Sequence, residues 1–543
     1  MKIVVLGGVA AGTKAAAKLM REDRSNEVIL LNKGESISYA GCGLPYYVGH
    51  VIEDRDELIV NTPERYEALT GVKVLTGTEA IKVDRTARQV TAVNLATGEQ
   101  TVYGYDKLVI ATGASPVRPP IEGIDLQNVF FMRTPQDAIA LRDAIAGGNV
   151  ARAVVVGAGY IGLEVAENLK AQGVKPFVLD MAPHALPGFD PECAEYIEGR
   201  LAEAGIPVVT GVKVTAIEGK DGRVARVLTS KKAYKADLVV MSAGIRPNTD
   251  FLADSGIEME RGVILTNALG QTNDPDIYAA GDCAMVRNAV TGKPAWSPMG
   301  STANISGRIV AQNMMGAQIP YRGVLGTAVC RLPGLDVGRT GLTEAQARDA
   351  GYDPESVVVM LDSKAHYMPG AGSVAIKMIA DKASRRLLGV QVMGQGAVDK
   401  IVDIAVVGIA MKATLEDLDA LDFAYAPPFS TAIHPFAQAL NVLKNKLAGK
   451  LDAMTPAQYA AGEAEGYRIL DVSKAPSVEG AQHIGLTEIT GPMDGIGKDE
   501  KVLLVCNRGR NAYLVQNRLR AFGYTNTKTL EGGSQFSDVT VDE

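Results

Sequence analysis

The first thirty residues alternate between short apolar runs and a helical stretch. Residues 3–6 are apolar, residues 13–20 are rich in alanine with helical spacing, and residues 28–31 are apolar again. A glycine-rich turn separates the first run from the helical stretch. This order predicts a strand, a helix and a second strand, as in a nucleotide-binding βαβ unit.

The same order recurs further along the chain. Residues 153–156 and 176–179 are the apolar runs, and residues 157–162 form the glycine-rich turn. Apolar runs at residues 108–110 and 277–279 also lead into glycine turns, and they lie on either side of this second unit. The second nucleotide-binding module is therefore predicted to be inserted within the first.

After about residue 326 the pattern changes to alternating strands. Strands are predicted at residues 356–361, 374–379 and 388–393, followed by an apolar helix around residues 401–411. This arrangement predicts an α+β layer packed on the nucleotide domains.

The last part of the chain predicts a further small unit. Residues 448–456, which contain Gly, Lys, Asp and Pro, are expected to be a linker. Beyond it, apolar strands at residues 467–472 and 501–505 precede a stretch of helical periodicity at residues 511–522. A small α/β unit is the expected result.

Composition and net charge exclude several classes of protein. With 543 residues, 47% hydrophobic and 22% charged, the chain is expected to form several globular domains. Its net charge of −7 offers no basic field for nucleic acid or an anionic membrane. The longest apolar run near the end, residues 404–411, is far short of the ~20 residues of a membrane span. No nucleic-acid or membrane partner is expected.

Cysteine and histidine usage favours a reducing, cytoplasmic location without a metal site. There are five cysteines, with no CxxC pair, and five histidines, with no HxxH or HExxH spacing. Of the cysteines, Cys193, Cys283 and Cys330 are expected to be packing residues.

The turn at residues 157–162 has the spacing GxGxxG. The first glycine permits the tight turn, the second lets a pyrophosphate approach, and the third lets the helix pack on the strand. Glu164 follows closely, and Asp180 ends the next strand, where a carboxylate would accept hydrogen bonds from ribose hydroxyls. That carboxylate would repel a 2′-phosphate, which favours NADH over NADPH. The alternative is an ordinary glycine-rich turn.

The first turn departs from this pattern. Val9 stands where the second glycine belongs, and Asn32 stands where an acid usually ends the second strand. Gly281-Asp282, after the run at residues 277–279, would complete the site, because an acid there can bond a ribityl chain or a second ribose. The alternative for Asp282 is an ordinary helix N-cap.

Cys42 stands between two glycines and is followed by Pro45 at an expected helix start. The next cysteine along the chain is Cys193, so no neighbouring thiol can close a local redox disulfide and Cys42 would cycle alone. The positive potential of a helix start is expected to favour a thiolate. Such a thiolate can hold an external thiol as a mixed disulfide, or become a persulfide or a sulfenate. The alternative is a buried, inert cysteine.

Cys506 is a second candidate nucleophile. It follows the strand at residues 501–505, and a helix follows its loop. Backbone N–H groups of such a loop form an anion cradle. Arg508 and Arg510 are expected to favour the thiolate further. The alternative is a solvated basic loop in which the cysteine is incidental.

Several segments together resemble one known family. These are GGVAAG (7–12), SYAGCGLPYYVG (38–49), IATGASP (110–116), VVVGAGYIGLE (154–164), IYAAGDCA (277–284) and AYAPPFS (424–430). From residue 1 to about residue 447 the chain resembles the single-cysteine branch of the FAD-dependent pyridine nucleotide-disulfide oxidoreductases, in particular the coenzyme A disulfide reductases. The Val9 departure is typical of this group.

The tail resembles a rhodanese domain in its CxxG loop, the strand at residues 469–472 and the sequence LEGG at residues 530–533. It departs at three places. Ser473 stands where rhodanese domains commonly carry arginine, Gln482-His483 replaces a Gly-His pair, and Asn511 stands where the loop usually ends in arginine.

The resemblance implies an α/β fold class with two nested Rossmann-like FAD and NAD(P) domains, an α+β dimerisation domain and a C-terminal rhodanese-like α/β domain. The expected boundaries are residues 1–114 and 247–325 for the FAD-binding domain, 115–246 for the NAD(P)-binding domain, 326–448 for the dimerisation domain and 455–543 for the rhodanese-like domain. The expected cofactor-binding residues are Gly7, Gly8, Ala11, Gly12, Asn32, Lys33, Ser38, Ala111, Thr112, Gly113, Gly157, Gly159, Tyr160, Ile161, Gly162, Glu164, Asp180, Gly244, Gly281 and Asp282.

The resemblance also implies the activity. It is an NAD(P)H-dependent reduction of coenzyme A disulfide, coenzyme A persulfide or polysulfide, with FAD as cofactor, NADH as reductant, NADPH also compatible, and coenzyme A as substrate or bound ligand. Cys42 would be the redox cysteine beside the flavin. Tyr367 and Tyr425 would reach the partner's active site in a homodimer, and Cys506 would handle sulfane sulfur. An asparagine that the family often has at Gly41 is absent.

Three alternatives stay open. With a persulfide, Cys42 would attack the sulfur bound to coenzyme A, or the opposite polarity would release hydrosulfide and leave a mixed disulfide. A rival activity is NADH oxidase or peroxidase through Cys42 sulfenic acid, although such relatives usually carry histidine where this chain has Ala10. In a third hypothesis the tail only binds or senses, and Cys506→Ser leaves turnover unchanged.

Overall fold

The computed structural model describes residues 1–541. They form two compact units: Met1–Pro183 with Gly205–Val324, and His184–Ala204 with the chain from Leu325 onwards. The short segment at residues 184–204 thus belongs to the second unit although it lies within the sequence of the first.

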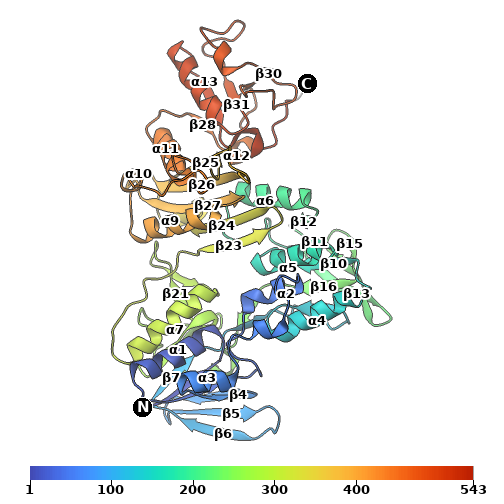
Figure 1. Cartoon of the computed structure of the whole chain (residues 1–543), viewed down its shortest axis with the longest axis vertical. Helices are drawn as coiled ribbons and strands as arrows, with labels where there is room; N and C mark the ends of the chain where they lie inside the picture. Colours follow the sequence, from blue (N-terminus) through green and yellow to red (C-terminus); the bar gives the residue numbers. More distant parts are fainter. Residues whose placement is uncertain (542–543) are drawn as a thin grey trace. The chain divides into compact units, whose positions relative to one another are not determined.

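The first unit contains a parallel sheet in the order β20-β7-β1-β2-β3. Its strands are β1 (Lys2–Leu6), β2 (Glu27–Leu31), β3 (Lys73–Leu75), β7 (Lys107–Ile110) and β20 (Ile277–Ala279). Its two faces are covered by α1 (Ala10–Glu22) and α7 (Gly300–Met314), and by the antiparallel sheet of β4 (Thr78–Asp84), β5 (Gln89–Asn94) and β6 (Gln100–Gly104). Figure 1 labels β7 of this sheet, with α1 beside it. Successive residues of β1 point to opposite faces. Ile3 and Val5 therefore pack with the helices, and Val4 and Leu6 pack with the antiparallel sheet.

A second parallel sheet has the order β12-β11-β10-β16-β9. Its strands are β9 (Val129–Phe131), β10 (Arg152–Val156), β11 (Lys175–Leu179), β12 (Val208–Val209) and β16 (Leu238–Met241), with helices α4 (Pro135–Ala146) and α5 (Tyr160–Ala171) and the antiparallel strands β13 (Val214–Lys220), β14 (Arg223–Thr229) and β15 (Ala233–Lys235). The chain enters and leaves this module through the antiparallel pair β8 (Ala114–Pro116) and β17 (Ile245–Pro247). The predicted insertion of one nucleotide-binding fold within the other is confirmed.

Smaller elements complete the first unit. They are α2 (Leu44–Val48), α3 (Pro63–Thr70), β18 (Met259–Glu260), β19 (Val263–Ile264), β21 (Met285–Arg287) and β22 (Pro294–Trp296). Of these, α2 matters most for the site, because it follows Cys42 directly.

The second unit contains an antiparallel sheet in the order β23-β24-β27-β26-β25. Its strands are β23 (Ala328–Leu332), β24 (Leu335–Gly341), β25 (Pro354–Asp362), β26 (Ser373–Asp381) and β27 (Leu387–Gly394), and its helices are α6 (Pro191–Glu203), α8 (Glu344–Asp349), α9 (Val398–Ala410), α10 (Leu415–Asp419) and α11 (Pro435–Leu447). α9 packs on β24 and β27, and α11 packs on β25 and β26. The predicted α+β layer is confirmed.

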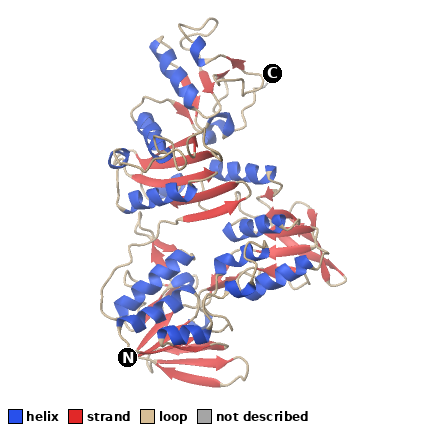
Figure 2. Ribbon diagram, viewed as in Figure 1, coloured by secondary structure: helices blue, strands red, loops and turns tan. Residues whose placement is uncertain are grey.

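The tail forms a parallel sheet in the order β28-β32-β31-β29-β30. Its elements are β28 (Ala453–Met454), α12 (Pro456–Ala460), β29 (Arg468–Asp471), β30 (Gln482–His483), β31 (Val502–Val505), α13 (Arg510–Ala521) and β32 (Thr527–Leu530). Figure 2 draws strands in red and helices in blue. β28 lies inside the stretch expected to be a linker and pairs with β32. That prediction is wrong at residues 453–454, because their backbone completes the tail sheet.

Some kinds of site can be examined over residues 1–541 as a whole. No helix in this range is long and apolar enough to cross a membrane. Nor does the range hold a group of three His, Cys, Asp or Glu side chains arranged to bind a metal ion. All five cysteines are free thiols, and of these Cys42 is exposed while the other four are buried.

Candidate active site

In the turn between β1 and α1, the backbone lies so close to other backbone atoms that side chains do not fit at its glycines. A Cβ atom on Gly7 would lie 2.1 Å from the carbonyl oxygen of Ala111, and one on Gly12 would lie 1.8 Å from the carbonyl oxygen of Gly7. The φ angle of Gly7 is +101°. α1 begins at Ala10, and no described side chain caps its N-terminus. Its first N–H groups can therefore donate hydrogen bonds to an anion such as a pyrophosphate.

The turn between β10 and α5 repeats this geometry. A Cβ atom on Gly157 would lie 2.2 Å from the carbonyl oxygen of Ser242, and one on Gly162 would lie 2.0 Å from the carbonyl oxygen of Gly157. A Cβ atom on Gly159 would meet nothing within 4 Å. The first and third glycines thus serve close packing, and the second leaves open space. A dinucleotide fits this arrangement.

Asp180 and Asn32 occupy equivalent positions after the second strand of each module. The N–H of Ala158 donates to Oδ2 of Asp180 at 2.6 Å, and the N–H of Gly8 donates to Oδ1 of Asn32 at 3.0 Å. Oδ1 of Asp180 also accepts from the N–H of Ala182 at 2.8 Å. Both side chains therefore shape the glycine turns, a role that the sequence did not suggest. The carboxylate keeps further lone pairs for ribose hydroxyls.

The Gly281-Asp282 pair lies against α1. Gly281 has a φ angle of +77°, and a Cβ atom there would lie 2.9 Å from the Cβ of Ala11. The carboxylate of Asp282 accepts a hydrogen bond from Arg133 at 3.0 Å and caps no helix. The N-cap alternative is therefore wrong. Sequence reasoning missed Arg133, whose signal is weak: it is a single cation just before Thr134, the N-cap of α4.

The segment that carries Cys42 is bonded to both glycine-turn modules. Cys42 lies in a single 3₁₀ turn before α2. On one side of it, the N–H of Ser38 donates to the carbonyl oxygen of Gly8 at 2.8 Å. On the other side, the hydroxyl of Tyr46 donates to Oε1 of Glu164 at 3.3 Å. The structure thus brings Cys42 between the two turns expected to hold the two dinucleotides.

The electrostatic surroundings of Cys42 differ from those expected. Desolvation by the surrounding protein raises the pKa of its thiol, the carboxylates of Glu164 and Asp282 raise it further, and Arg133 lowers it. The prediction that the helix start favours a thiolate is wrong. The reason is physical: burial of the thiol disfavours its charged form, and the two carboxylates add to this effect beside a helix of only five residues. The neutral thiol is the main form of Cys42 at neutral pH.

The other expected cofactor residues lie on both modules. The hydroxyl of Thr112 donates to the carbonyl oxygen of Asn248 at 2.7 Å. Gly244 has open space where a Cβ atom would be, and Ile161 is 41% exposed. Lys33 instead forms an ion pair with Glu79 and is largely exposed. The part of each residue in cofactor binding stays a prediction.

Tyr367 and Tyr425 lie together in the second unit. Their side chains are 64% and 49% exposed. A hydrogen bond from Tyr367 raises the pKa of the Tyr425 hydroxyl. The structure thus joins two residues that are far apart in sequence and leaves both rings facing outwards.

Cys506 directly follows β31 and is 3% exposed. Its Sγ accepts a hydrogen bond from the N–H of Ala512, at the start of α13, at 3.4 Å. This agrees with the expected anion cradle. Arg508 does not point into the loop, because its guanidinium bonds Asp362 at 2.5 Å and Ser373 at 2.9 Å. The expected effect of Arg508 on the thiol stays a prediction.

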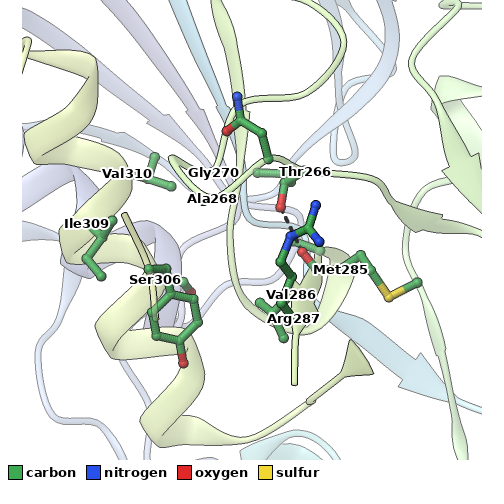
Figure 3. Close-up of a pocket in the computed structure, with 13 residues that line it drawn as sticks. Thr266, Ala268, Gly270, Met285, Val286, Arg287, Ser306, Ile309 and Val310 are labelled. Carbon is green, nitrogen blue, oxygen red and sulfur yellow. Dashed lines mark hydrogen bonds between the residues drawn. The ribbon is translucent and has the colours of Figure 1, made fainter. Parts of the chain in front are cut away.

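A small cavity in the first unit lies beside α7. It has a volume of about 30 Å³ and is lined by Thr266, Ser306, Ile309 and Val310 among others (Figure 3). The hydroxyl of Thr266 donates to the carbonyl oxygen of Met285 at 2.7 Å, as the dashed line shows. The cavity has room for one or two water molecules. It is too small for a nicotinamide or a flavin ring.

Two nested dinucleotide-binding folds, with one exposed thiol between their glycine turns, define a dinucleotide-linked thiol oxidoreductase. Comparison with family profiles agrees. The pyridine nucleotide-disulphide oxidoreductase profile matches residues 1–304, its dimerisation domain matches residues 328–437, and the rhodanese-like domain matches residues 437–535. The chain belongs to the pyridine nucleotide-disulphide oxidoreductase family, which implies FAD and NAD(P)H as cofactors.

Individual relatives cover most or all of the chain. The NAD(P)H sulfur oxidoreductase (CoA-dependent) of Pyrococcus abyssi is 36% identical over 81% of this chain and 98% of its own length. The NADH oxidase of Methanocaldococcus jannaschii is 34% identical over 83% of this chain and 100% of its own length. A solved NAD-dependent persulfide reductase from A. fulgidus has 34% identity and a TM-score of 0.94, covering 99% of this chain and 100% of its own. The resemblance inferred from the motifs is confirmed.

Proposed function

We propose that this protein is a homodimeric, FAD-dependent reductase that uses NADH to reduce coenzyme A persulfide, coenzyme A disulfide or polysulfide through Cys42. One observation carries the proposal. Cys42 is the exposed member of five free cysteines, and its segment is bonded to both glycine-turn modules. The names of the Pyrococcus and A. fulgidus relatives support sulfur as the electron acceptor.

The reaction consumes one NADH and one proton for each sulfur–sulfur bond. Bound FAD supplies the two-electron step between nicotinamide and sulfur. The turn around Gly159 and the carboxylate of Asp180 hold NADH, and that carboxylate disfavours the 2′-phosphate of NADPH. Cys42 must first lose its proton, and its thiolate then attacks one sulfur of the substrate. With coenzyme A disulfide, the S–S bond breaks, one coenzyme A thiolate leaves, and a mixed disulfide forms on Cys42.

A persulfide offers Cys42 two sulfur atoms. Attack on the outer, sulfane sulfur leaves a persulfide on Cys42 and releases coenzyme A as thiolate. Attack on the inner sulfur leaves a mixed disulfide and releases hydrosulfide. Either product carries the S–S bond that the electrons of NADH then cleave, so both routes yield coenzyme A and hydrogen sulfide.

A second copy of the chain is expected to cover the exposed face of the second unit. Several large apolar side chains there are more than half exposed: Val407, Met411, Leu421, Phe429 and Ile433. Burying these side chains against a second copy is favourable. Tyr367 and Tyr425 also face outwards, and in a homodimer they would reach the partner's Cys42 site.

NADH oxidase activity through Cys42 sulfenic acid is the second candidate. The Methanocaldococcus relative, which carries that name, supports it. That alignment covers 83% of this chain, whereas the persulfide reductase covers 99% of it, with the tail included. This persulfide reductase, whose match includes the tail, therefore supports sulfur as the acceptor.

The deciding experiment is single-turnover reoxidation. Enzyme reduced with one equivalent of NADH is mixed with coenzyme A persulfide, coenzyme A disulfide, polysulfide, hydrogen peroxide or oxygen in parallel. The proposal expects the sulfur acceptors to reoxidise the enzyme faster than peroxide or oxygen. Faster reoxidation by oxygen or peroxide would favour the oxidase instead.

A further inference from the structure

The tail is bonded to the edge of the antiparallel sheet through a buried acid. β25 is the outermost strand of that sheet, and edge strands present unpaired N–H groups. Here the N–H of Val358, in β25, donates to Oε2 of Glu531 at 2.9 Å. Glu531 is 4% exposed, and its Oε1 accepts from Lys446 at 2.7 Å. The ammonium group of Lys446 thus balances the negative charge of Glu531, and it also lies 3.1 Å from Glu355.

A second anchor lies at the far end of β25. Arg508 donates to Asp362 at 2.5 Å, to Ser373 at 2.9 Å and to Gln535 at 3.0 Å. Asp362 and Ser373 face each other as the last pair of β25 and β26. Beyond this pair, the two strands open into the loop at residues 363–372, which carries Tyr367. The guanidinium therefore clamps the base of that loop.

The segment that follows Glu531 is hydrogen-bonded to the loop that carries Cys506 and Arg508. The N–H of Ser534 donates to the carbonyl oxygen of Cys506 at 3.1 Å, and the N–H of Gln535 donates to that of Asn507 at 3.0 Å. A Cβ atom on Gly533 would lie only 1.9 Å from the Cys506 carbonyl oxygen. The segment after Glu531 and the Cys506 loop thus pack without space between them.

We propose that Arg508 is a positioning residue for sulfur transfer: its bonds to Asp362 and Ser373 hold the Cys506 loop at the base of the Tyr367 loop. This inference rests on the proposed function, because it requires that the tail delivers sulfane sulfur for reduction. Arg508 then joins the tail to the antiparallel sheet, instead of contacting the substrate anion.

The chemistry that this position serves is a sulfur transfer without net redox change. The Cys506 thiolate attacks the terminal sulfur of a polysulfide, one S–S bond breaks, and the shortened polysulfide leaves with the electron pair. Cys506 then carries a persulfide. A coenzyme A thiolate attacks its outer sulfur, which regenerates the Cys506 thiolate and forms coenzyme A persulfide. A loop held in one place favours this second attack.

The test compares two substrates in variants of the full-length holoenzyme. Turnover of polysulfide with coenzyme A uses the tail, whereas turnover of coenzyme A disulfide uses Cys42 alone. We expect Arg508→Ala and Asp362→Ala each to lower the first rate by about 10- to 100-fold and to leave the second within about twofold of wild type. The charge swap Arg508→Asp with Asp362→Arg should restore most of the first rate.

Hydrogen exchange supplies a readout that is independent of turnover. Amides of residues 363–372 should exchange faster in Arg508→Ala and Asp362→Ala. Arg510→Ala is the matched control, since it removes an exposed arginine two residues away. It should leave exchange in this loop unchanged.

Several results would overturn the inference. One is a loss of polysulfide turnover in Arg508→Ala while Asp362→Ala keeps the wild-type rate, which would indicate that Arg508 contacts the substrate. Others are a charge swap that restores nothing, and unchanged polysulfide turnover in Cys506→Ser. Absence of coenzyme A disulfide, persulfide and polysulfide turnover in the wild-type enzyme would instead refute the proposed function itself.

Discussion

Replacing Lys377 with methionine tests how the second unit is held together. Lys377 is 1% exposed, and its ammonium lies 3.1 Å from Asp190 and 2.7 Å from Glu344, with Glu192 as a third partner. Burial raises the pKa of Glu344, but Lys377 and a hydrogen bond from Ser356 outweigh it and lower the pKa from 4.5 to about 2. This depression corresponds to about 3 kcal/mol of stability at neutral pH. In the wild type it is lost as the pH falls from about 4.5 towards 2.

The Lys377→Met variant removes the cation shared by three carboxylates, of which Glu344 keeps Arg348 as a partner at 2.5 Å. We expect a loss of about 3–5 kcal/mol at pH 7. Proton uptake then relieves the repulsion, so the stability of the variant should rise between pH 7 and pH 5, where the Glu344 contribution in the wild type is still complete.

Hydrogen exchange in β26, corrected for the intrinsic pH dependence of exchange, measures this stability locally. The single tryptophan, Trp296, lies in the first unit and does not report on β26. Lys382→Met is the matched control, because the ion pair of Lys382 with Asp353 is exposed and should contribute little. A loss below about 1 kcal/mol in Lys377→Met, or a variant that weakens between pH 7 and pH 5, would refute the reasoning.

Three further changes probe the site in the first unit. Asp180→Ala removes the carboxylate that holds the second glycine turn and should raise the dissociation constant of NADH by about tenfold or more; calorimetric titration with an unchanged constant would contradict this. Glu164→Gln removes a negative charge that raises the pKa of Cys42, so half-maximal alkylation by iodoacetamide should move to lower pH, whereas Arg133→Gln should move it to higher pH; shifts of the same sign would be inconsistent with the account. Gly7→Val places a branched side chain on a backbone carbonyl and should yield colourless protein, so purified variant that keeps its flavin absorbance would exclude a role for this turn in binding FAD.

Features set by close backbone approach could be predicted from the sequence. Gly7 and Gly157 are such positions, because any side chain there would collide with a carbonyl oxygen just after a neighbouring strand. The spacing of these glycines, together with the apolar runs, was sufficient to predict two nested folds. The solitary state of Cys42 was equally visible, since it depends on counting cysteines along the chain.

Features set by long-range electrostatics could not be predicted in this way. The groups that raise the pKa of Cys42 come from α5 and from the turn after β20, far away in the sequence. Arg508 pairs with Asp362 across 146 positions. No local pattern distinguishes an arginine that points into its own loop from one that docks on another domain. The strand at residues 453–454 was not predicted either, because two residues are too few to show a periodic pattern.

The central claim is that Cys42 alone passes electrons to sulfur. Its most direct test is stopped-flow mixing of NADH-reduced Cys42→Ser enzyme with coenzyme A persulfide, alongside the wild type. We expect the variant to retain FAD and to be reduced by NADH, but not to be reoxidised by the persulfide, while the wild type yields a mixed disulfide or a persulfide on Cys42 after an acid quench. Reoxidation of the variant at the wild-type rate would contradict the claim.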